Sequence, residues 1–233
     1  MKHADVTPAL VAAETDRVAA TAASLGNGAV LGPSLCQGWS RGHVLTHLAR
    51  NADALVRVCD VALTGTADTM YDDVESRDAD IERGARRAAH DQATDVRDTA
   101  ARLAERLEAL RPEHAEVRVE RTPGGFPIPV GMVPFMRLRE VVYHHVDLDA
   151  GYTFASAPAE VVALLLRDAA NRLAHDDAPP SVHITTTEGG EHVIGEGTTR
   201  VTGSAADVLL WLARGRTDGV HFDGPVPTLP FGG

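Results

Sequence analysis

The sequence is poor in aromatic side chains and rich in acidic ones, and both features exclude classes of partner. Aromatic residues make up only 4% of the 233 residues, which disfavours a surface that stacks nucleic-acid bases. The 33 acidic residues outnumber the 22 basic ones, and the formal charge is −11. Such a charge repels phosphate backbones, so we expect no nucleic-acid partner. An anionic small molecule remains possible, but its binding requires a local cluster of arginines.

Cysteine and long apolar segments are also scarce. The two cysteines, Cys36 and Cys59, form neither a CxxC pair nor a disulfide framework, and we interpret them as small buried thiols in a reducing compartment. The N-terminal segment has no apolar core of signal-peptide length. No apolar run approaches the roughly 20 residues that a membrane helix requires. We therefore expect a cytoplasmic protein without a membrane segment.

Apolar residues recur at helical spacing through the first part of the chain. Thr7 and Pro8 are typical of a helix start, and Ser40 is a suitable N-cap for a second helix. The pattern predicts four long helices that begin near Pro8, Ser40, Ser76 and Pro134 and that end near Ala22, Leu63, Leu110 and Gly151. A short strand in "EVRVERT" and a Pro/Gly loop at 123–134 interrupt them. Four long helices with one interruption indicate a helical bundle.

The pattern changes after Tyr152. The segment "TFASAP" is a predicted linker, and "PAEVVALLLRDAANRLAH" is a predicted helix. Short strands in "SVHITTTE", "EHVIGEG", "TRVTGS" and "GVHFDG" then surround a helix that Ser204 can cap. The sequence thus predicts an α+β protein, with a four-helix bundle at 1–151 and a small α+β domain at 158–233.

Two helical segments carry residues suited to bind a metal ion. "GWSRGHVLTHLARNAD" places His43 and His47 on one helix face, and "RLREVVYHHVDLDAG" places Glu140, His144 and Asp147 on another. If the two faces meet, His47, Glu140 and His144 supply three ligands and leave an open position, which is typical of catalytic zinc. Spacing alone does not decide this, since hydrogen-bonded or solvated histidines fit it too. His43 has the alternatives of a supporting partner, another ligand or no role.

Taken together, these two segments resemble the mycothiol-dependent maleylpyruvate isomerase family. The resemblance extends over nearly the whole chain, including "SRDADIERGAR" and "GSAADVLLWLARGRTDGVHFDGPVPTLP". It implies a DinB-like bundle followed by a domain similar to sterol carrier proteins. It also implies Zn²⁺, or another divalent metal, on His47, Glu140 and His144. The family's functional arginines correspond best to Arg77 and Arg216, with Arg214 as an alternative to the second.

The resemblance implies an isomerase of the gentisate pathway of aromatic degradation that uses mycothiol as its thiol cofactor. A metal-activated thiolate adds to the cis double bond of maleylpyruvate, the resulting single bond rotates, and elimination gives fumarylpyruvate. Arg77 and Arg216 are expected to bind the substrate's carboxylates and to serve both catalysis and cofactor binding. Asp147 is expected to orient a histidine ligand or to carry a proton. The family also favours a monomer.

Two other functions remain open on the sequence. One is a thiol S-transferase that joins mycothiol or another low-molecular-weight thiol to a different electrophile at the same metal site. The other is a non-catalytic binding protein, which predicts an apolar tunnel in residues 158–233 and no metal. A nucleophilic role for Cys36 is not expected, because no basic residues surround it in the sequence. The sequence leaves the roles of Cys36, His43 and the 123–134 loop undefined.

Overall fold

The structure, a computed structural model, describes residues 1–230. The chain forms two compact units: residues 2–150 form one, and Gly151 onward, together with Met1, forms the other. The N-terminal unit is built from helices with one small hairpin, and the C-terminal unit contains a four-stranded sheet. This is the α+β fold that the sequence predicts.

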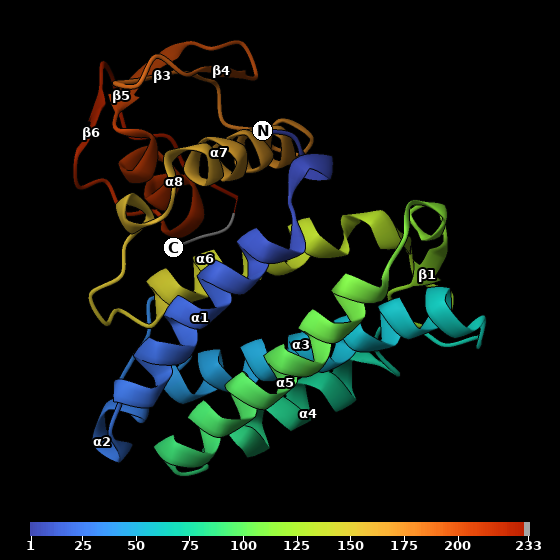
Figure 1. Cartoon of the computed structure of the whole chain (residues 1–233). Coiled ribbons are helices and arrows are strands. Elements are labelled where there is room, and N and C mark those ends of the chain that lie inside the picture. Colours follow the sequence, from blue (N-terminus) through green and yellow to red (C-terminus); the bar gives the residue numbers. More distant parts are fainter. Residues whose placement is uncertain (231–233) are drawn as a thin grey trace. The chain divides into compact units, whose positions relative to one another are not determined.

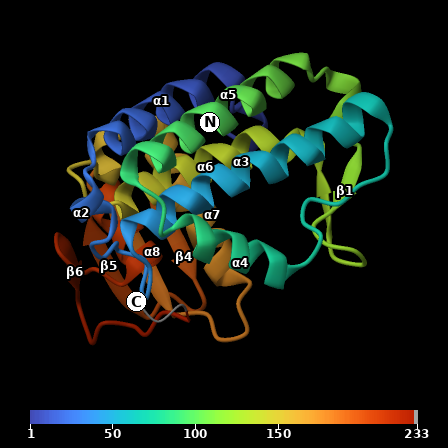
Figure 2. The ribbon, with the colours of Figure 1, turned by 90° about the horizontal axis from the view of Figure 1, so that it is seen from below.

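Four long helices form the N-terminal bundle. They are α1 (Pro8–Ser24), α3 (Arg41–Thr64), α5 (Ala89–Ala109) and α6 (Val133–Asp147). The packed pairs are α1 with α5, α5 with α3, α3 with α6, and α6 with α1, so the helices form a closed ring around one core (Figures 1 and 2). Val44, Leu45 and Leu48 of α3 and Val141 of α6 are fully buried in this core. The shorter helices α2 (Asn27–Val30) and α4 (Val74–Gly84) also contact α3.

Local capping explains where the first two long helices start. The Thr7 hydroxyl accepts a hydrogen bond from the Leu10 amide at 3.2 Å, and the Ser40 hydroxyl accepts one from the His43 amide at 3.4 Å. Each bond satisfies an amide that has no partner inside its helix. Gly65 ends α3 in the left-handed conformation, with φ 73°. The helix starts predicted near Pro8 and Ser40 are thereby confirmed.

The predicted single helix from Ser76 to Leu110 is wrong, because the chain breaks between α4 and α5. Gly84 ends α4 directly against the side chain of Thr46. After the break, the buried Gln92 amide donates to the carbonyl oxygens of Gly84, Ala85 and Arg87 at 3.1–3.3 Å. These bonds satisfy the carbonyls that the break leaves without helical partners. Because the partner comes from the next helix, the apolar periodicity does not reveal the break.

The predicted loop at 123–134 is partly ordered as a strand. β1 (Arg118–Glu120) pairs antiparallel with β2 (Pro127–Pro129), and a 3-10 turn at Val130–Met132 leads into α6. Prolines are tolerated in this short ribbon because it has free edges. Helix α6 also ends at Asp147, before the predicted end at Gly151, and Asp149 adopts a positive φ of 47° in the turn that follows.

The C-terminal unit has two helices on one face of a sheet (Figure 1). Its elements are α7 (Ala159–Ala174), β3 (Val182–Thr186), β4 (Glu191–Ile194), β5 (Thr199–Gly203), α8 (Ala205–Arg214) and β6 (Val220–Phe222). The strand order is β4-β3-β5-β6, with β3 and β5 parallel and the other pairs antiparallel. Ser204 caps α8 through a 3.1 Å bond from the Asp207 amide, and Trp211 of α8 is buried. The predicted linker contains a 3-10 turn at Phe154–Ser156 with a buried Phe154.

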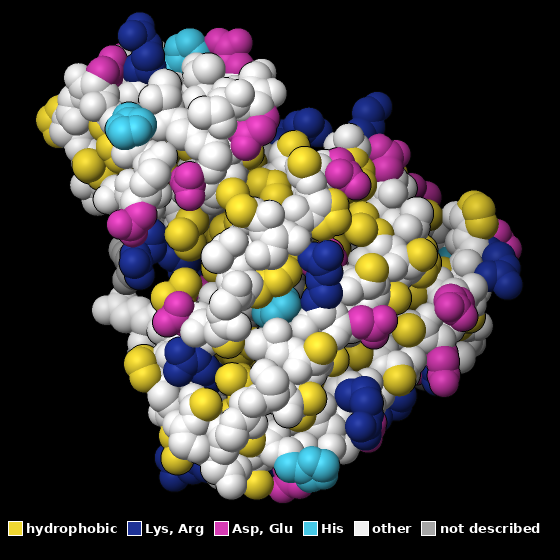
Figure 3. Space-filling model, turned by 60° about the vertical axis from the view of Figure 1, so that its left-hand side comes forward, with side chains coloured by type: hydrophobic (Ala, Val, Ile, Leu, Met, Phe, Trp, Pro, Cys, Tyr) yellow, Lys and Arg dark blue, Asp and Glu magenta, His cyan; other side chains and the backbone are white. Residues whose placement is uncertain are grey.

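Two features of the described residues bear on possible partners. None of their helices combines the length and apolarity that crossing a bilayer demands. On the face that Figure 3 shows, the described Lys and Arg side chains are interspersed with acidic and apolar ones rather than gathered in a continuous basic patch. This face therefore lacks the electrostatic footprint of a nucleic-acid surface.

Candidate metal centre

The start of α3 and the end of α6 are held together, which places the two predicted ligand segments side by side. The Arg41 guanidinium donates to the carbonyl oxygens of Leu148 and, at 3.1 Å, Asp149, which follow the end of α6. The Leu35 amide donates to the Asp147 carbonyl at 2.9 Å. Positive charge is favourable at a helix C-terminus, so these contacts fix the register of α3 against α6.

His47, Glu140 and His144 meet at the centre of this contact, and we refer to them as the triad. Glu140 Oε2 lies 2.8 Å from His47 Nε2 and 3.3 Å from His144 Nε2. One ligand atom from each residue lies within 4.8 Å of the others. Their side chains are 7%, 21% and 15% exposed, respectively, so the triad is largely shielded from water but still accessible. The structure therefore brings together the three residues that the sequence singled out.

Burial and mutual hydrogen bonding set the charge state of the triad. Burial alone would raise the pKa of Glu140, but hydrogen bonds from His144 and His47 lower it well below its usual range. Burial also lowers the pKa of His47, and the positive charge of His144 lowers it further. Although burial opposes it, bonds to Asp147, Cys36 and Glu140 raise the pKa of His144 well above its usual range. Glu140 is thus the anion of the triad, and His144 carries the proton.

Asp147 supports His144 from the other side of the ring. Its Oδ2 lies 2.8 Å from His144 Nδ1, and its side chain is 1% exposed. A buried carboxylate on one nitrogen of an imidazole leaves the other nitrogen directed at the triad, which is the usual arrangement around metal-binding histidines. The position fits the predicted orienting role of Asp147.

Cys36 lies in the site, where the sequence did not place it. Its Sγ donates to Asp147 Oδ2 at 3.1 Å and lies 3.9 Å from His144 Nδ1. Cys36, His144 and Asp147 thereby form a second set of possible metal donors that shares His144 with the triad. Cys59, in contrast, is fully buried in α3, and burial raises the pKa of its thiol to about 12. The interpretation of both cysteines as simple buried thiols holds only for Cys59.

His43 and Trp39 surround the triad without joining it. His43 Nδ1 accepts a hydrogen bond from the Ser40 amide at 3.1 Å, while its Nε2 lies 3.2 Å from Glu82 Oε1. Both ring nitrogens are therefore occupied by structural partners at the start of α3. The Trp39 ring packs with its centroid 5.5 Å from that of His47 and 6.5 Å from that of His144. Trp39 thus packs against the triad from its position before the start of α3.

A cavity of about 330 Å³ opens beside the triad, and we refer to it as the triad cavity. His47 and Glu140 form part of its wall, together with residues from the β1–β2 hairpin and the loop before α4. Arg77 also lines it, and the functional role that the family resemblance implies for this arginine stays a prediction. Its Nη2 lies 3.3 Å from His47 Nδ1, and its buried Nε has no hydrogen-bond partner among the described residues.

Two further arginines, Arg121 and Arg139, line the triad cavity and were missed in the sequence. Arg139 immediately precedes Glu140 and lies three residues after Met136, another wall residue. That helical spacing was a usable signal. Arg121 follows β1, and only the folding of the hairpin brings it to the cavity, so no local pattern reveals it.

Arg216 belongs to the C-terminal unit rather than to the triad cavity. It follows α8, its side chain is 55% exposed, and Nη2 lies 3.4 Å from Asp218 Oδ2. Its predicted role at the site stays a prediction.

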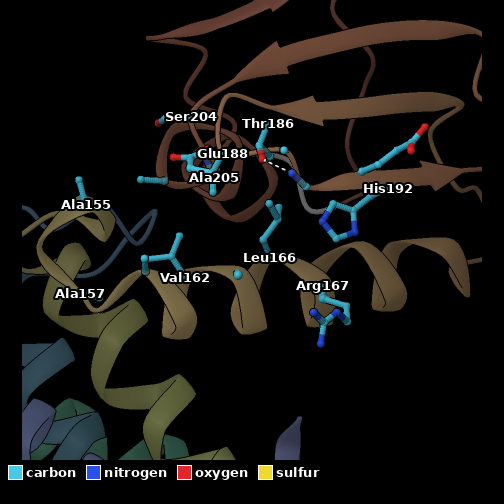
Figure 4. A pocket seen from close by; sticks show the side chains of 16 residues that line it. Ala155, Ala157, Val162, Leu166, Arg167, Thr186, Glu188, His192, Ser204 and Ala205 are labelled. Atoms are coloured by element: carbon cyan, nitrogen blue, oxygen red, sulfur yellow. Dashed lines mark hydrogen bonds between the residues drawn. The ribbon is translucent and has the colours of Figure 1, made fainter. Parts of the chain in front are cut away.

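The C-terminal unit has a cavity of its own, of about 750 Å³ (Figure 4). Alanines and Leu166 of the α7 side form much of the wall, but Arg167, Glu188 and His192 line it as well. Glu188 accepts a bond from the Ala205 amide at 3.0 Å, and Thr186 accepts one from the Gly190 amide at 2.9 Å. Such a mixed wall differs from the apolar tunnel expected for a lipid-carrying tail.

The chemistry of the triad fits a divalent metal ion. Two imidazole nitrogens and one carboxylate oxygen converge, and a carboxylate supports one imidazole from behind. Three protein ligands with a side open to a cavity correspond to catalytic rather than structural zinc sites. The set would also bind other divalent transition metals.

Comparison with known proteins identifies the family of the chain. A family model described as the mycothiol maleylpyruvate isomerase N-terminal domain matches residues 11–149. The chain belongs to this family. Two solved structures match it, namely that of the mycothiol-dependent maleylpyruvate isomerase and that of a variant of it with one histidine replaced by alanine. Each is 25% identical in sequence, with a TM-score of 0.89 and coverage of 99% of both chains. No curated protein sequence matches the chain.

Family membership confirms the resemblance seen in the sequence. The family model ends at residue 149, close to the end of the N-terminal unit. The solved structures extend the match to the rest of the chain, so the C-terminal unit shares the family fold as well.

Proposed function

We propose that the protein is a mycothiol-dependent isomerase that converts maleylpyruvate to fumarylpyruvate. The observation that carries the proposal is the convergence of the three triad ligand atoms within 4.8 Å beside a cavity lined by arginines, with His47 and Glu140 in its wall. The substrate class requires both features, because the thiol must be activated and the substrate carries two carboxylates.

The residues His47, Glu140 and His144 would hold the metal. When bound, a divalent ion stabilises a thiolate and lowers the pKa of the thiol that coordinates it. The thiol supplies a reversible nucleophile, whose addition to the cis double bond leaves a single bond that can rotate. Asp147 keeps His144 in the tautomer whose Nε2 faces the triad.

The hydrogen bond between Arg77 and His47 depends on which ring nitrogen of His47 carries the proton. In the structure its guanidinium donates to His47 Nδ1, so the ring proton resides on Nε2 and is donated to Glu140. If His47 held a metal through Nε2, its ring proton would lie on Nδ1, which could then not accept a hydrogen bond from Arg77. Nη2 of Arg77 would then be available to a carboxylate or an enolate oxygen of the substrate, which it would bind as a charge-assisted donor. The functional role that the family motif implies for Arg216 stays a prediction, and no carboxylate of the substrate is assigned to it.

The decisive experiment is an isomerase assay with zinc-loaded protein, maleylpyruvate and mycothiol. Thiol-free and chelator-treated samples are the controls. We expect turnover that requires both thiol and metal, and we expect His47→Ala and His144→Ala to lose metal and activity together while circular dichroism retains the helices. Full metal occupancy in both variants would exclude the triad as the metal site.

A folded, metal-replete protein without turnover would reject the isomerase. The same protein would then be assayed as a thiol S-transferase with other electrophiles, since that reaction uses the same metal and thiol. The monomeric state and the cytoplasmic location stay predictions of the sequence.

A further inference from the structure

The triad cavity contains more positive charge than the metal chemistry requires. Arg77, Arg121 and Arg139 line it, and Glu140 is the carboxylate in its wall. Arg77 also forms an ion pair with Asp78 at 2.7 Å, so the excess positive charge comes from Arg121 and Arg139. Glu140 is already bonded to both triad histidines. The cavity is therefore cationic inside a protein whose net charge is −11, and such a concentration of guanidinium groups favours an anionic ligand.

Arg121 differs from most arginines of the N-terminal unit in its partners. Arg50, Arg57 and Arg106 each form an ion pair with an aspartate at 2.6–2.9 Å. Within residues 1–230, Arg121 has no such carboxylate partner; its guanidinium carbon lies instead 5.5 Å from the centre of the Tyr71 ring and 6.0 Å from that of Phe126. Aromatic contacts hold a guanidinium in place and leave its N–H donors free for an anion.

Tyr71 connects Arg121 to the metal end of the cavity. Arg77, which contacts His47, also lies over the Tyr71 ring, at 5.7 Å. The Tyr71 amide donates to the Arg121 carbonyl at 2.9 Å, and the Met70 amide donates to the Glu120 carbonyl at 2.9 Å. The loop that carries Tyr71 is thereby fixed to the β1–β2 hairpin. One ring thus positions two arginines, one at the triad and the other at the hairpin.

We propose that Arg121 determines specificity for a doubly charged substrate by binding the carboxylate that lies away from the triad. Arg77 serves the reacting end, Tyr71 positions both guanidinium groups, and Arg139 adds to the positive field from α6. This inference rests on the proposed function, and it assigns recognition of a second carboxylate to the N-terminal unit itself. It also gives the β1–β2 hairpin a role in substrate selection.

The kinetic test replaces Arg121 with glutamine and compares two cis substrates. One is maleylpyruvate, and the other is the monocarboxylate in which a methyl group replaces the carboxylate of the pyruvate end. Arg121→Gln should lower kcat/KM for the dicarboxylate by roughly 10- to 100-fold, as the loss of a charge-assisted hydrogen bond predicts. It should leave kcat/KM for the monocarboxylate and the metal content unchanged. Arg118→Gln, an exposed change at the start of the strand that precedes Arg121, is the matched control and should behave as wild type.

Equal losses for both substrates, or no loss for either, would overturn the proposal. A wild-type protein that does not isomerise maleylpyruvate at all would reject the proposed function. A binding measurement then tests the role of Arg121 independently of the isomerase activity. Calorimetry on the zinc-loaded protein, without thiol, would use heptanedioate, a saturated dicarboxylate of the same chain length, with heptanoate as the comparison. We expect heptanedioate to bind more tightly, with an advantage that Arg121→Gln removes and Arg118→Gln retains. If heptanedioate does not bind, or binds equally to both variants, Arg121 is not the carboxylate site.

Discussion

Asp147 provides the sharpest test of how the triad is supported. It is 1% exposed, and Oδ2 accepts hydrogen bonds from His144 Nδ1 at 2.8 Å and from Cys36 Sγ at 3.1 Å. Asp147→Asn preserves the shape of the side chain but removes its negative charge. Loss of the outer partner of a metal ligand typically lowers metal affinity by roughly 10- to 100-fold, which corresponds to about 1.4–2.7 kcal/mol.

The loss should depend on pH, because Asp147 also stabilises the proton that competes with the metal. Its hydrogen bond contributes to the raised pKa of His144 in the metal-free protein, and metal binding must displace that proton. Wild-type affinity should therefore fall more steeply on acidification than that of the variant. The difference in zinc affinity between the wild type and the variant should be largest at alkaline pH, where His144 is neutral in both, and should become smaller as the pH falls.

Competition titrations of zinc against a chromophoric chelator over a pH series measure both effects. Asp149→Asn is the matched control: its carboxylate is 65% exposed, and asparagine tolerates the positive φ of 47° at this position. The control should bind zinc as wild type does. If Asp147→Asn binds zinc within twofold of wild type at every pH, the hydrogen bond to His144 does not support the metal site and the reasoning fails.

Two further predictions concern stability. His145 is 2% exposed, and burial, together with the charge of Arg17, lowers its pKa to about 4 from 6.5. The unfolded chain therefore binds a proton at this residue before the folded protein does on acidification. The free energy of unfolding should fall by roughly 2 kcal/mol as the pH drops through the range between the two pKa values, after allowance for solvent screening. Urea titrations should show His145→Gln losing most of that dependence, and an unchanged slope would contradict the assignment. In Gly84→Ala the new Cβ would lie 2.3 Å from Thr46 Cγ2, so we expect a loss of about 1–3 kcal/mol. Gly28→Ala, with nothing within 4 Å of its Cβ, should cause no comparable loss, and equal effects would refute the packing argument.

The parts of the fold that the sequence predicts are those fixed by local chemistry. Thr7, Ser40 and Ser204 begin helices because a side-chain oxygen next to a helical pattern satisfies a free amide wherever it occurs. Glu140 and His144 share a face because the helical period requires it. That this face meets His47 follows from the bundle and from the contacts of Arg41, which the spacing within either helix does not contain.

The residues that were missed depend on contacts between distant segments. The break between α4 and α5 relies on Gln92, which reaches back to the carbonyls of the preceding turn. Cys36 contacts Asp147 across 111 positions of the chain, and Arg121 reaches the triad cavity only because the hairpin forms. Apolar periodicity reports the faces that helices bury, but it carries no information about polar side chains that meet across tertiary contacts.

The protonation of the two histidines links metal binding to anion binding. In the metal-free triad, His144 donates to Asp147 through Nδ1, so its Nε2 already faces the metal position. His47 has the opposite arrangement, since Nδ1 accepts from Arg77 and Nε2 donates to Glu140. Metal binding through the two Nε2 atoms would therefore remove the extra proton of His144 and reverse the tautomer of His47, and the second change would release Arg77. Because Arg77 lines the triad cavity, its release adds a free donor at the site where the substrate's carboxylates are proposed to bind. Metal loading and substrate affinity should thus be coupled through this one ring, and linkage makes the coupling reciprocal.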